Sequence, residues 1–293
     1  MNAYILSLTK EANLKDQWDF GFLNDFLTGK VWKPSSWQGF DIKNVSKLPK
    51  TDTAIVAIPA RHHKGLEAEV NKQLQRIDNV VLFLMGDEEA DFDVELIDHK
   101  SIHIWVQNPH LGKHDAYNRI GTGYPTHMRK YMHEPLVKDL DVFFSGQVTH
   151  DRRLELSDVL EANTSNYDIE INRTKGFTQG YSKQDYYDFM HRTRIAPAPS
   201  GAVIPDSFRL FEGLESLAVV VADQKTPSGE IMEYWDWLFG EITPFHKVTN
   251  WFDLNNIMPE VLDDWYTYIF KQTTWWISWK RKFAYKVMEQ LSV

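Results

Sequence analysis

Short apolar runs alternate along the first half of the chain with segments of helical periodicity. The runs Tyr4–Leu8, Thr53–Ile58, Val80–Met85 and Ile102–Val106 have the length and the β-branched and aromatic content of strands. Between the second and third runs, apolar residues recur every three or four positions from Leu66 to Ile77, which predicts a helix with one apolar stripe. Strands that alternate with helices are typical of a parallel sheet with crossover helices.

The second half of the chain repeats this order. One of its helices begins with a Ser-x-x-Asp capping box at Ser182, a common start signal. The predicted strands are Asp141–Ser145, Ile195–Ala198 and Leu217–Ala222, and the predicted helices are Arg152–Ala162, Ser182–Arg192 and about Ser207–Ser216.

The C-terminal segment Asp263–Leu291 places Trp and other apolar residues close to one helical stripe, which predicts one or two long amphipathic helices. We therefore expect an α/β fold of two Rossmann-like lobes that face a cleft, with a C-terminal helix that crosses the lobes. The expected division is residues 1–135, 136–260 and 261–293. A polar Gly- and His-rich stretch, residues 108–133, is expected to include the passage between the lobes.

Composition narrows the functional classes. The 293 residues contain no Cys, which excludes disulfides, thiolate metal sites and cysteine nucleophiles. The formal net charge of -9 disfavours whole-surface attraction to nucleic acid or anionic lipid. No apolar run is long enough to span a membrane, and no secretion signal is recognisable, so we expect a cytoplasmic protein.

One loop has the features of a phosphate-binding site. Asp206 or Ser207 can cap the helix that follows, and a helix N-terminus offers N–H groups and a positive dipole end to an anion. Further along this helix, Glu212 can accept hydrogen bonds from a ribose diol, as acidic residues do in dinucleotide folds. Arg209 can neutralise a phosphate, or it can pair with Glu212 at i,i+3. The properties of this helix alone are also consistent with ordinary packing and surface ion pairs, without a bound ligand.

The motifs around this loop resemble those of a known family. Asp185–Ile195 follows the pattern Asp-Tyr-x-x-x-Met-x-x-Thr-Arg-Ile, and Pro199–Gly201 gives Pro-x-Gly. Asp206–Leu214 reads Asp-Ser-x-Arg-Leu-x-Glu-Gly-Leu, and Val219–Asp223 is a Val-Val-Val-x-Asp strand. Together they resemble the C-terminal lobe of the exostosin-like glycosyltransferases, which are inverting, sugar-nucleotide-dependent enzymes of the GT-B type. The resemblance covers about Phe143 to Asp223.

The resemblance implies a donor site in the second lobe. It places Ser207 and Arg209 near the donor diphosphate and Glu212 at the ribose, and it makes Phe143–Gly146 the first strand and turn of that lobe. Leu217–Ala218 stands where the family usually has Gly-Cys-Ile-Pro, a departure that bears mainly on the donor sugar. The residues expected to bind the donor are Gly146, Arg152, Arg153, Ser200, Ser207, Arg209 and Glu212.

An inverting transfer also needs a base for the acceptor hydroxyl. The acidic run Asp87-Glu88-Glu89, directly after Val80–Gly86, is our first candidate region, with Asp87 and Glu88 as its named residues, and Asp19 is the second. Two Asp-x-Asp sequences, at Asp91–Asp93 and Asp139–Asp141, are as many as chance provides, so we expect no essential cofactor and no bound metal.

The predicted activity is transfer of a sugar from a nucleotide-sugar donor to a hydroxyl acceptor with inversion, and the family resemblance implies a UDP-linked donor. The acceptor is either a glycan or hydroxymethylated phage DNA, the latter suggested by the cations at residues 280–282. The alternative is a two-lobe protein that binds a nucleotide sugar or a glycan without catalysis. The sequence does not indicate an oligomeric state.

Overall fold

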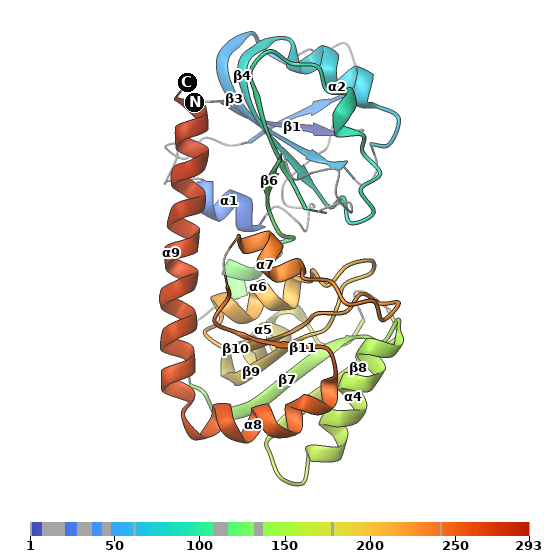
Figure 1. Cartoon of the computed structure of the whole chain (residues 1–293), viewed down its shortest axis with the longest axis vertical. Helices are drawn as coiled ribbons and strands as arrows, with labels where there is room; N and C mark the ends of the chain where they lie inside the picture. Colours follow the sequence, from blue (N-terminus) through green and yellow to red (C-terminus); the bar gives the residue numbers. More distant parts are fainter. Residues whose placement is uncertain are drawn as a thin grey trace. The chain divides into compact units, whose positions relative to one another are not determined.

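The computed structural model describes residues 2–7, 21–27, 37–42, 48–60, 63–107, 117–131, 137–176, 179–240 and 242–292 (Figure 1). The chain divides into two compact units. Unit 1 comprises Met1–Thr126 with Trp279–Val293, and unit 2 comprises His127–Ser278. Each unit contains a parallel sheet flanked by helices, which confirms the expected α/β class and the Rossmann-like character of both halves.

The sheet of unit 1 has six parallel strands in the order β2-β1-β3-β4-β5-β6. The order changes direction between β1 and β3, and ligands of such sheets bind beyond the carboxyl ends of the strands at this point. The elements are β1 (Asn2–Ser7), α1 (Gly21–Leu27), β2 (Gln38–Asp41), β3 (Thr51–Pro59), α2 (Glu67–Leu74), β4 (Ile77–Met85), β5 (Ile102–Val106) and β6 (Asn118–Arg119), with a 3-10 turn at Val94–Leu96.

Helices cover both faces of this sheet. On one face, α2 buries Val70 and its apolar neighbours in a cluster with residues of the strands. On the other face, the rings of Phe83 and Trp105 stack with centroids 5.5 Å apart, and Phe283 meets Trp105 edge-on at 4.9 Å. Phe22 of α1 lies 5.5 Å from Phe283. Strands buried on both sides explain why β3 and β4 appear in the sequence as continuous apolar runs.

Unit 2 repeats the same order of strands. Its sheet runs β11-β10-β9-β7-β8, all parallel, so the direction changes between β7 and β9. The elements are α3 (Met128–Tyr131), β7 (Leu140–Gln147), α4 (Asp151–Asn163), β8 (Ile169–Thr174), α5 (Lys183–Arg192), β9 (Thr193–Ala198), α6 (Phe208–Glu215), β10 (Val219–Asp223), α7 (Tyr234–Phe239), β11 (His246–Val248), α8 (Leu254–Asp263) and α9 (Trp265–Leu291), with a 3-10 turn at Trp251–Asp253.

Successive side chains along the strands of unit 2 point to opposite faces of the sheet. Phe144 joins α4 and α8 in one apolar cluster, whereas Phe143 points to the other face and stacks on Phe189 of α5 at 5.4 Å. α6 approaches that second face closely at Gly213. A Cβ there would lie 2.7 Å from Val220 and 2.9 Å from Ala196, so only glycine allows this helix to pack on β9 and β10.

The long helix α9 contributes to both units, with residues up to Ser278 in unit 2 and those from Trp279 onward in unit 1. In unit 2 it completes the hydrogen bonding of β10. β11 is short, and the buried amide of Gln272 accepts from the Val220 N–H at 3.0 Å and donates to the Ala218 carbonyl at 2.7 Å. Gln272 therefore takes the place of a neighbouring strand.

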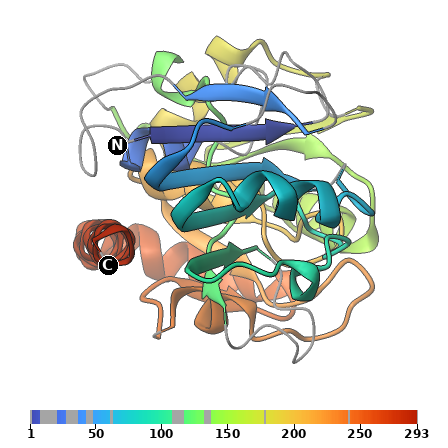
Figure 2. The same cartoon turned by 90° about the horizontal axis from the view of Figure 1, so that it is seen from above.

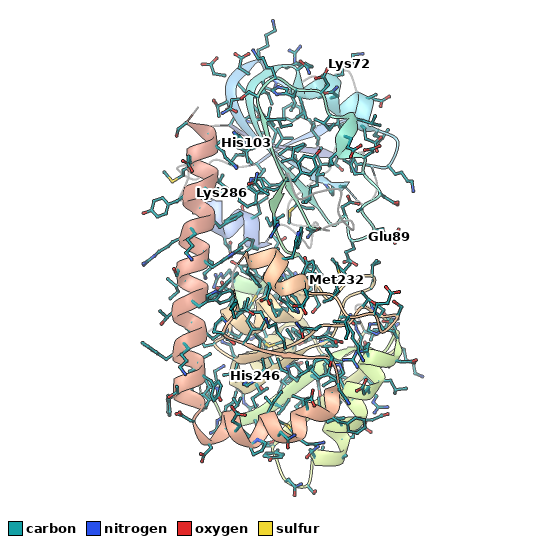
Figure 3. The ribbon with its side chains drawn as sticks, in the orientation of Figure 1. Lys72, Glu89, His103, Met232, His246 and Lys286 are labelled. Carbon is teal, nitrogen blue, oxygen red and sulfur yellow. The ribbon has the colours of Figure 1, made fainter. Side chains whose placement is uncertain are left out.

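Figure 2 shows the C-terminal end of α9, seen along the helix. This end, in unit 1, carries a second glutamine with a similar role. The indole N–H of Trp105 donates to the Gln290 side-chain oxygen at 3.0 Å, and Asn79 donates to the Gln290 carbonyl at 2.8 Å. Lys286 is labelled in Figure 3, and its ammonium group lies 5.5 Å from the centroid of the Trp105 ring. The expected C-terminal amphipathic helix is confirmed, as one continuous element.

Several other expectations are confirmed. Each predicted strand overlaps an observed one, and the Ser182 hydroxyl caps α5 by accepting from the Asp185 N–H at 3.2 Å. The two units divide after Thr126, and Trp279–Val293 belongs to unit 1. The expected boundaries at residues 135 and 260 stay a prediction. Of the described helices, none is long and apolar enough to cross a membrane.

Replacing Gln272 with Leu tests the role of this side chain. The substitution leaves two buried groups without partners, the N–H of Val220 in β10 and the carbonyl of Ala218 just before it, at a cost of about 1–3 kcal/mol each. We expect the free energy of unfolding to fall by roughly 2–6 kcal/mol in urea titrations. Gln184→Leu, on the exposed side of α5, is the control and is expected to change stability by less than about 0.5 kcal/mol. Equal effects would contradict this role.

Lys138 provides a second test. Its ammonium group donates to the carbonyls of Thr193 and Ser216, at the C-terminal ends of α5 and α6, at 2.8 and 2.7 Å. Burial lowers the pKa of Lys138 to about 7. Between pH 7 and pH 10 the unfolded chain therefore binds more protons than the folded one, so stability rises with pH.

We expect the stability of the wild type, relative to Lys138→Met, to increase by roughly 1 kcal/mol per pH unit between pH 7 and pH 9. Urea titrations at a series of pH values measure this difference. A difference that does not change with pH would show that the folded protein keeps Lys138 charged.

Candidate functional site

The strand order of unit 2 indicates a ligand site at the carboxyl ends of β7 and β9, where the order changes direction. β7 leads into α4, and β9 leads through the loop Pro199–Ser207 into α6. Both helix N-termini therefore begin at the carboxyl edge of the sheet, on either side of the change in strand order. The N–H groups of a helix's first turn point along its axis, and together with the positive end of the helix dipole they favour an anion at this edge.

Arg209 lies across the end of β7. Its Nε and Nη2 atoms donate to the Ser145 carbonyl at 3.1 and 2.6 Å, and its guanidinium lies 5.2 Å from the centroid of the Phe144 ring. A Cβ at Gly146 would lie 1.8 Å from Nη2, so this glycine makes room for the guanidinium. Within the described part of the chain, Arg209 forms no ion pair, and Glu212, one turn further along α6, is the carboxylate whose pKa its charge lowers.

Ser207 stands directly before α6. Its extended backbone, with φ -152° and ψ 149°, is that of an N-cap residue, but its side chain makes no capping hydrogen bond. The side chain is only 6% exposed, and among the described residues its hydroxyl has no hydrogen-bond partner. A buried hydroxyl without a partner is costly, and an anion at the helix N-terminus would supply one.

His150 and Arg153 fix the loop that leads to Ser207. Three donors converge on the Ser200 carbonyl: Arg153 Nε at 3.1 Å, Arg153 Nη2 at 3.0 Å and His150 Nε2 at 3.3 Å. His150 Nε2 also lies 3.1 Å from the Gly201 carbonyl. Burial lowers the pKa of His150, and the charge of Arg153 lowers it further, so the ring is a neutral donor through Nε2.

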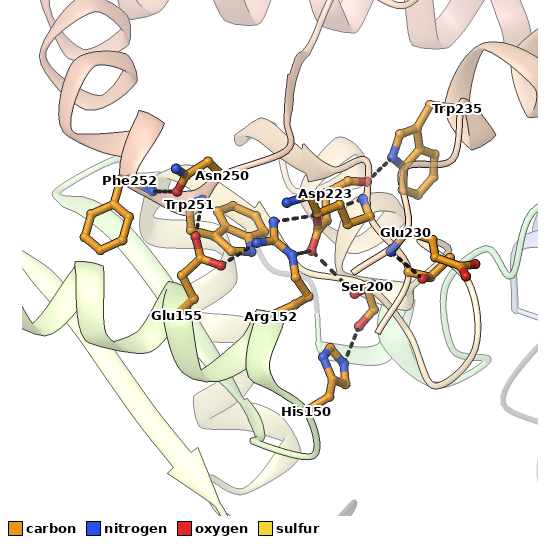
Figure 4. Close-up of polar contacts among 12 residues, drawn as sticks. His150, Arg152, Glu155, Ser200, Asp223, Glu230, Trp235, Asn250, Trp251 and Phe252 are labelled. Atoms are coloured by element: carbon orange, nitrogen blue, oxygen red, sulfur yellow. Dashed lines mark hydrogen bonds and ion pairs between the residues drawn. The ribbon is translucent and has the colours of Figure 1, made fainter. Parts of the chain in front are cut away.

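Arg152 belongs to a buried network behind this loop (Figure 4). Its Nε and Nη2 atoms donate to the two Asp223 oxygens at 3.1 and 2.7 Å, and Nη1 bonds Glu155. The guanidinium lies 5.8 Å from the Trp251 ring centroid, and Ser200 Oγ lies 3.4 Å from Asp223. In this structure Arg152 neutralises Asp223, and Ser200 is fully buried beside it.

Glu212 is buried one turn further along α6, at i+3 from Arg209. Its side chain is 4% exposed, and its two oxygens accept from the hydroxyls of Tyr186 and Tyr187 at 2.7 and 2.8 Å. Burial raises the pKa of Glu212, while the two phenols and Arg209 oppose that rise. Both carboxylate oxygens thus have partners from α5, and ribose binding by Glu212 stays a prediction.

The candidate bases belong to unit 1. Asp87 is buried, and its Oδ1 accepts from the Asp91 N–H at 2.9 Å, while its own N–H donates to Gln107 at 3.1 Å. Glu88 is half-buried in the same turn. Asp19 lies outside the described residues. A catalytic role for these three acids stays a prediction.

The two Asp-x-Asp sequences bind other protein groups. Asp91 pairs with Lys64 at 2.8 Å, and Asp93 caps the turn that follows by accepting from the Glu95 N–H at 3.1 Å. Asp139 and Asp141 pair with Arg192 and Arg194. Among the residues that the structure describes, no group of three His, Asp or Glu side chains is arranged to hold a metal ion.

The donor residues expected from the sequence fall into two groups. The first group lies at the carboxyl edge of the sheet: Gly146 and Arg209 at the end of β7, and Arg153 and Ser207 at the loop that enters α6. The second group forms hydrogen bonds and ion pairs in the interior of unit 2, and it consists of Arg152, Ser200 and Glu212. His150 escaped the sequence analysis because a single histidine in a turn has no periodicity or motif. Its position between a strand and a helix was the available signal.

Comparison with known proteins adds no family assignment. No protein-family model matches the chain, and no curated protein sequence matches it.

The contact between Gly146 and Arg209 can be tested by a double-mutant cycle. Gly146→Ala forces the guanidinium away from the Ser145 carbonyl, and we expect a loss of about 1–3 kcal/mol in the free energy of unfolding. In an Arg209→Ala background the clash is absent, so the same substitution is expected to cost less than half as much. Equal costs in both backgrounds, measured by urea titration, would show that the side chain of Arg209 lies elsewhere.

Proposed function

We propose that this chain is a glycosyltransferase of the GT-B type that transfers a sugar from a nucleotide-sugar donor, with unit 2 as the donor-binding unit. The observation that carries the proposal is the arrangement of Arg209 and Ser207 at the N-terminus of α6. It lies where the strand order changes direction, which is where parallel α/β sheets bind nucleotides. The sequence motifs of the exostosin-like family fall on the same loop and helix.

A diphosphate matches this arrangement in charge and in hydrogen bonding. The Ser145 carbonyl accepts from two of the five N–H donors of Arg209. The guanidinium therefore has further N–H groups for a ligand at the carboxyl edge of the sheet. The N-terminus of α6 adds main-chain N–H groups, and the Ser207 hydroxyl adds another donor. Charge-assisted bonds to phosphate oxygens are about twice as strong as neutral ones.

The ribose is assigned to Glu212 in this proposal. A carboxylate offers about four lone-pair sites, and the hydroxyls of Tyr186 and Tyr187 occupy one on each oxygen. A ribose diol would bind through the sites that remain, or in place of a phenol. The donor is expected to be UDP-linked, as the family resemblance implies.

The reaction is a single displacement at the anomeric carbon. A base takes the proton of the acceptor hydroxyl, the acceptor oxygen bonds to the anomeric carbon, and the bond to the diphosphate breaks with inversion. Arg209 and the α6 N-terminus stabilise the charge that develops on the leaving diphosphate. Asp87, Glu88 and Asp19 are the proposed bases, and the acceptor is a hydroxyl of a glycan or of hydroxymethylated DNA.

Thermal-shift measurements with Arg209→Met test the donor site. UDP is expected to raise the unfolding midpoint of the wild type, because a ligand that binds only the native state stabilises it. Loss of the guanidinium is expected to weaken UDP binding by about tenfold or more. Arg192→Met is the matched control, because Arg192 also lies over a phenylalanine ring, at 5.8 Å from the Phe189 centroid.

A midpoint that no nucleoside diphosphate shifts in the wild type would contradict the proposal. An equal loss of binding in Arg209→Met and Arg192→Met would refute the role of Arg209. Donor binding without turnover on any glycan or DNA acceptor would instead favour the non-catalytic alternative.

A further inference from the structure

One side of α9 is buried within the chain, and the opposite side exposes large apolar side chains. Trp276, Phe283 and Val287 are buried. The exposed side carries five large apolar residues, which are Tyr266 (81% exposed), Phe270 (72%), Ile277 (42%), Tyr285 (69%) and Met288 (38%). A single exposed apolar residue is ordinary on a protein surface, but a contiguous apolar patch is typical of an interaction site.

Four of these residues form one narrow stripe along the helix. An α-helix turns through about 100° per residue, so Phe270, Ile277 and Met288 lie within about 40° of Tyr266 around the axis. We call these four residues the apolar stripe. Tyr285 lies beside the stripe, about 100° from Tyr266. The exposed apolar residues therefore share one side of α9 and are not scattered around it.

α9 also differs from the rest of the chain in charge. Five cations and one acid, Glu289, give the helix a formal charge of +4, and with the -9 of the whole chain this leaves -13 on the other residues. The cations are Lys271, Lys280, Arg281, Lys282 and Lys286. α9 is therefore a basic element in an acidic protein, and attraction to an anionic surface is concentrated there.

Two exposed cations border the apolar stripe. Arg281 and Lys271 lie about 60° and 140° around the axis from Tyr266, in the direction of Tyr285. Among the described residues, neither of these two cations forms an ion pair. An apolar stripe bordered by basic residues is the pattern of helices that lie in the surface of a membrane.

The acids closest along the chain leave the charge of these two cations available. Asp264 stands seven residues before Lys271, and Glu289 stands eight residues after Arg281. Seven or eight residues correspond to roughly 10–12 Å along a helix axis. This distance is at least one Debye length at physiological salt, so salt screens both acids from the cations.

We propose that the exposed side of α9 binds the surface of a membrane that contains anionic phospholipid. The apolar stripe enters the headgroup layer, and Lys271 and Arg281 contact lipid phosphates. The long apolar stems of these two side chains lie along the stripe while their charged ends reach the phosphates. The buried side of α9 stays packed within the chain, so the helix lies along the membrane and does not span it. This surface does not include the donor site, and its binding does not depend on sugar transfer.

Lipid matches both properties of this surface, whereas each other occupant fails on one of them. An anionic bilayer has a negative surface potential and an apolar layer directly beneath it. Duplex nucleic acid attracts the cations, but Ile277 and Met288 gain little from a phosphate backbone. A second copy of the chain would bring two helices of charge +4 together, which charge repulsion opposes.

Sedimentation of the full chain with lipid vesicles tests the proposal. We expect binding to phosphatidylcholine vesicles that contain phosphatidylglycerol, weaker binding as salt is raised, and little binding to phosphatidylcholine alone. Each basic residue near an anionic surface changes affinity about fivefold, so Lys271→Gln with Arg281→Gln is expected to weaken binding by about tenfold or more. Lys72→Gln with Lys175→Gln removes the same charge from exposed positions outside α9 and is expected to leave binding unchanged.

The apolar stripe is tested separately by Phe270→Ser. Loss of the ring is expected to weaken binding to the phosphatidylglycerol vesicles by about fivefold or more, because less apolar surface leaves water. Phe252→Ser is the matched control, since Phe252 is 61% exposed and lies outside α9. Circular dichroism and thermal unfolding show whether each variant is folded.

A wild type that binds neither kind of vesicle would overturn the proposal. Equal losses in the control variants and the α9 variants would also overturn it, because the position of the charge or the ring would then not matter. Binding of the wild type to a duplex DNA oligonucleotide but to no vesicle would identify nucleic acid as the occupant instead. A dimer in sedimentation velocity that Phe270→Ser abolishes, without vesicle binding, would identify a second copy of the chain.

Discussion

The carboxyl edge of the unit 2 sheet depends on arginine side chains that satisfy main-chain carbonyls. Near the carboxyl ends of β7 and β9, Arg209 donates to the Ser145 carbonyl and Arg153 donates to the Ser200 carbonyl. These bonds determine where the loop to α6 runs. They also hold cationic groups at the place where the helix N-termini favour an anion.

The partner of each arginine decides what it can still bind. Arg152 meets Asp223 in a fully buried ion pair, and that pair is electrically neutral and already satisfied. Among the described residues, Arg209 donates to a carbonyl and lies over a ring face, which orient the guanidinium, and it forms no ion pair. A positive group held in place before the ligand arrives loses little conformational entropy on binding, which is the basis of the proposed diphosphate site.

The sequence predicted the elements whose physical signals are local. β4 and β7 are buried on both faces and appear as apolar runs, and the cap at Ser182 was recognisable from its spacing. β8 was missed because, as an edge strand with half-exposed residues on both faces, it has no alternation of apolar and polar positions. β11 was missed because three residues are too few to show a period.

The candidate site was predictable only in part, for a related reason. Motif spacing identified the loop and helix that contain Ser207 and Arg209, because those residues are close in sequence. The ion pair of Arg152 with Asp223, and the bonds of Glu212 to Tyr186 and Tyr187, join positions far apart in the chain. The order of the strands in the sheet decides which of these distant residues lie close enough to bond, and no local pattern in the sequence indicates the pairs.

The affinity of the wild type for UDP compared with uridine, measured by isothermal titration calorimetry, tests the central claim most directly. The two ligands share the base and the ribose and differ in the diphosphate alone. If Arg209 and the α6 N-terminus bind the diphosphate, UDP will bind tighter than uridine by about tenfold or more. Equal affinities, or no binding of either ligand, would contradict the account.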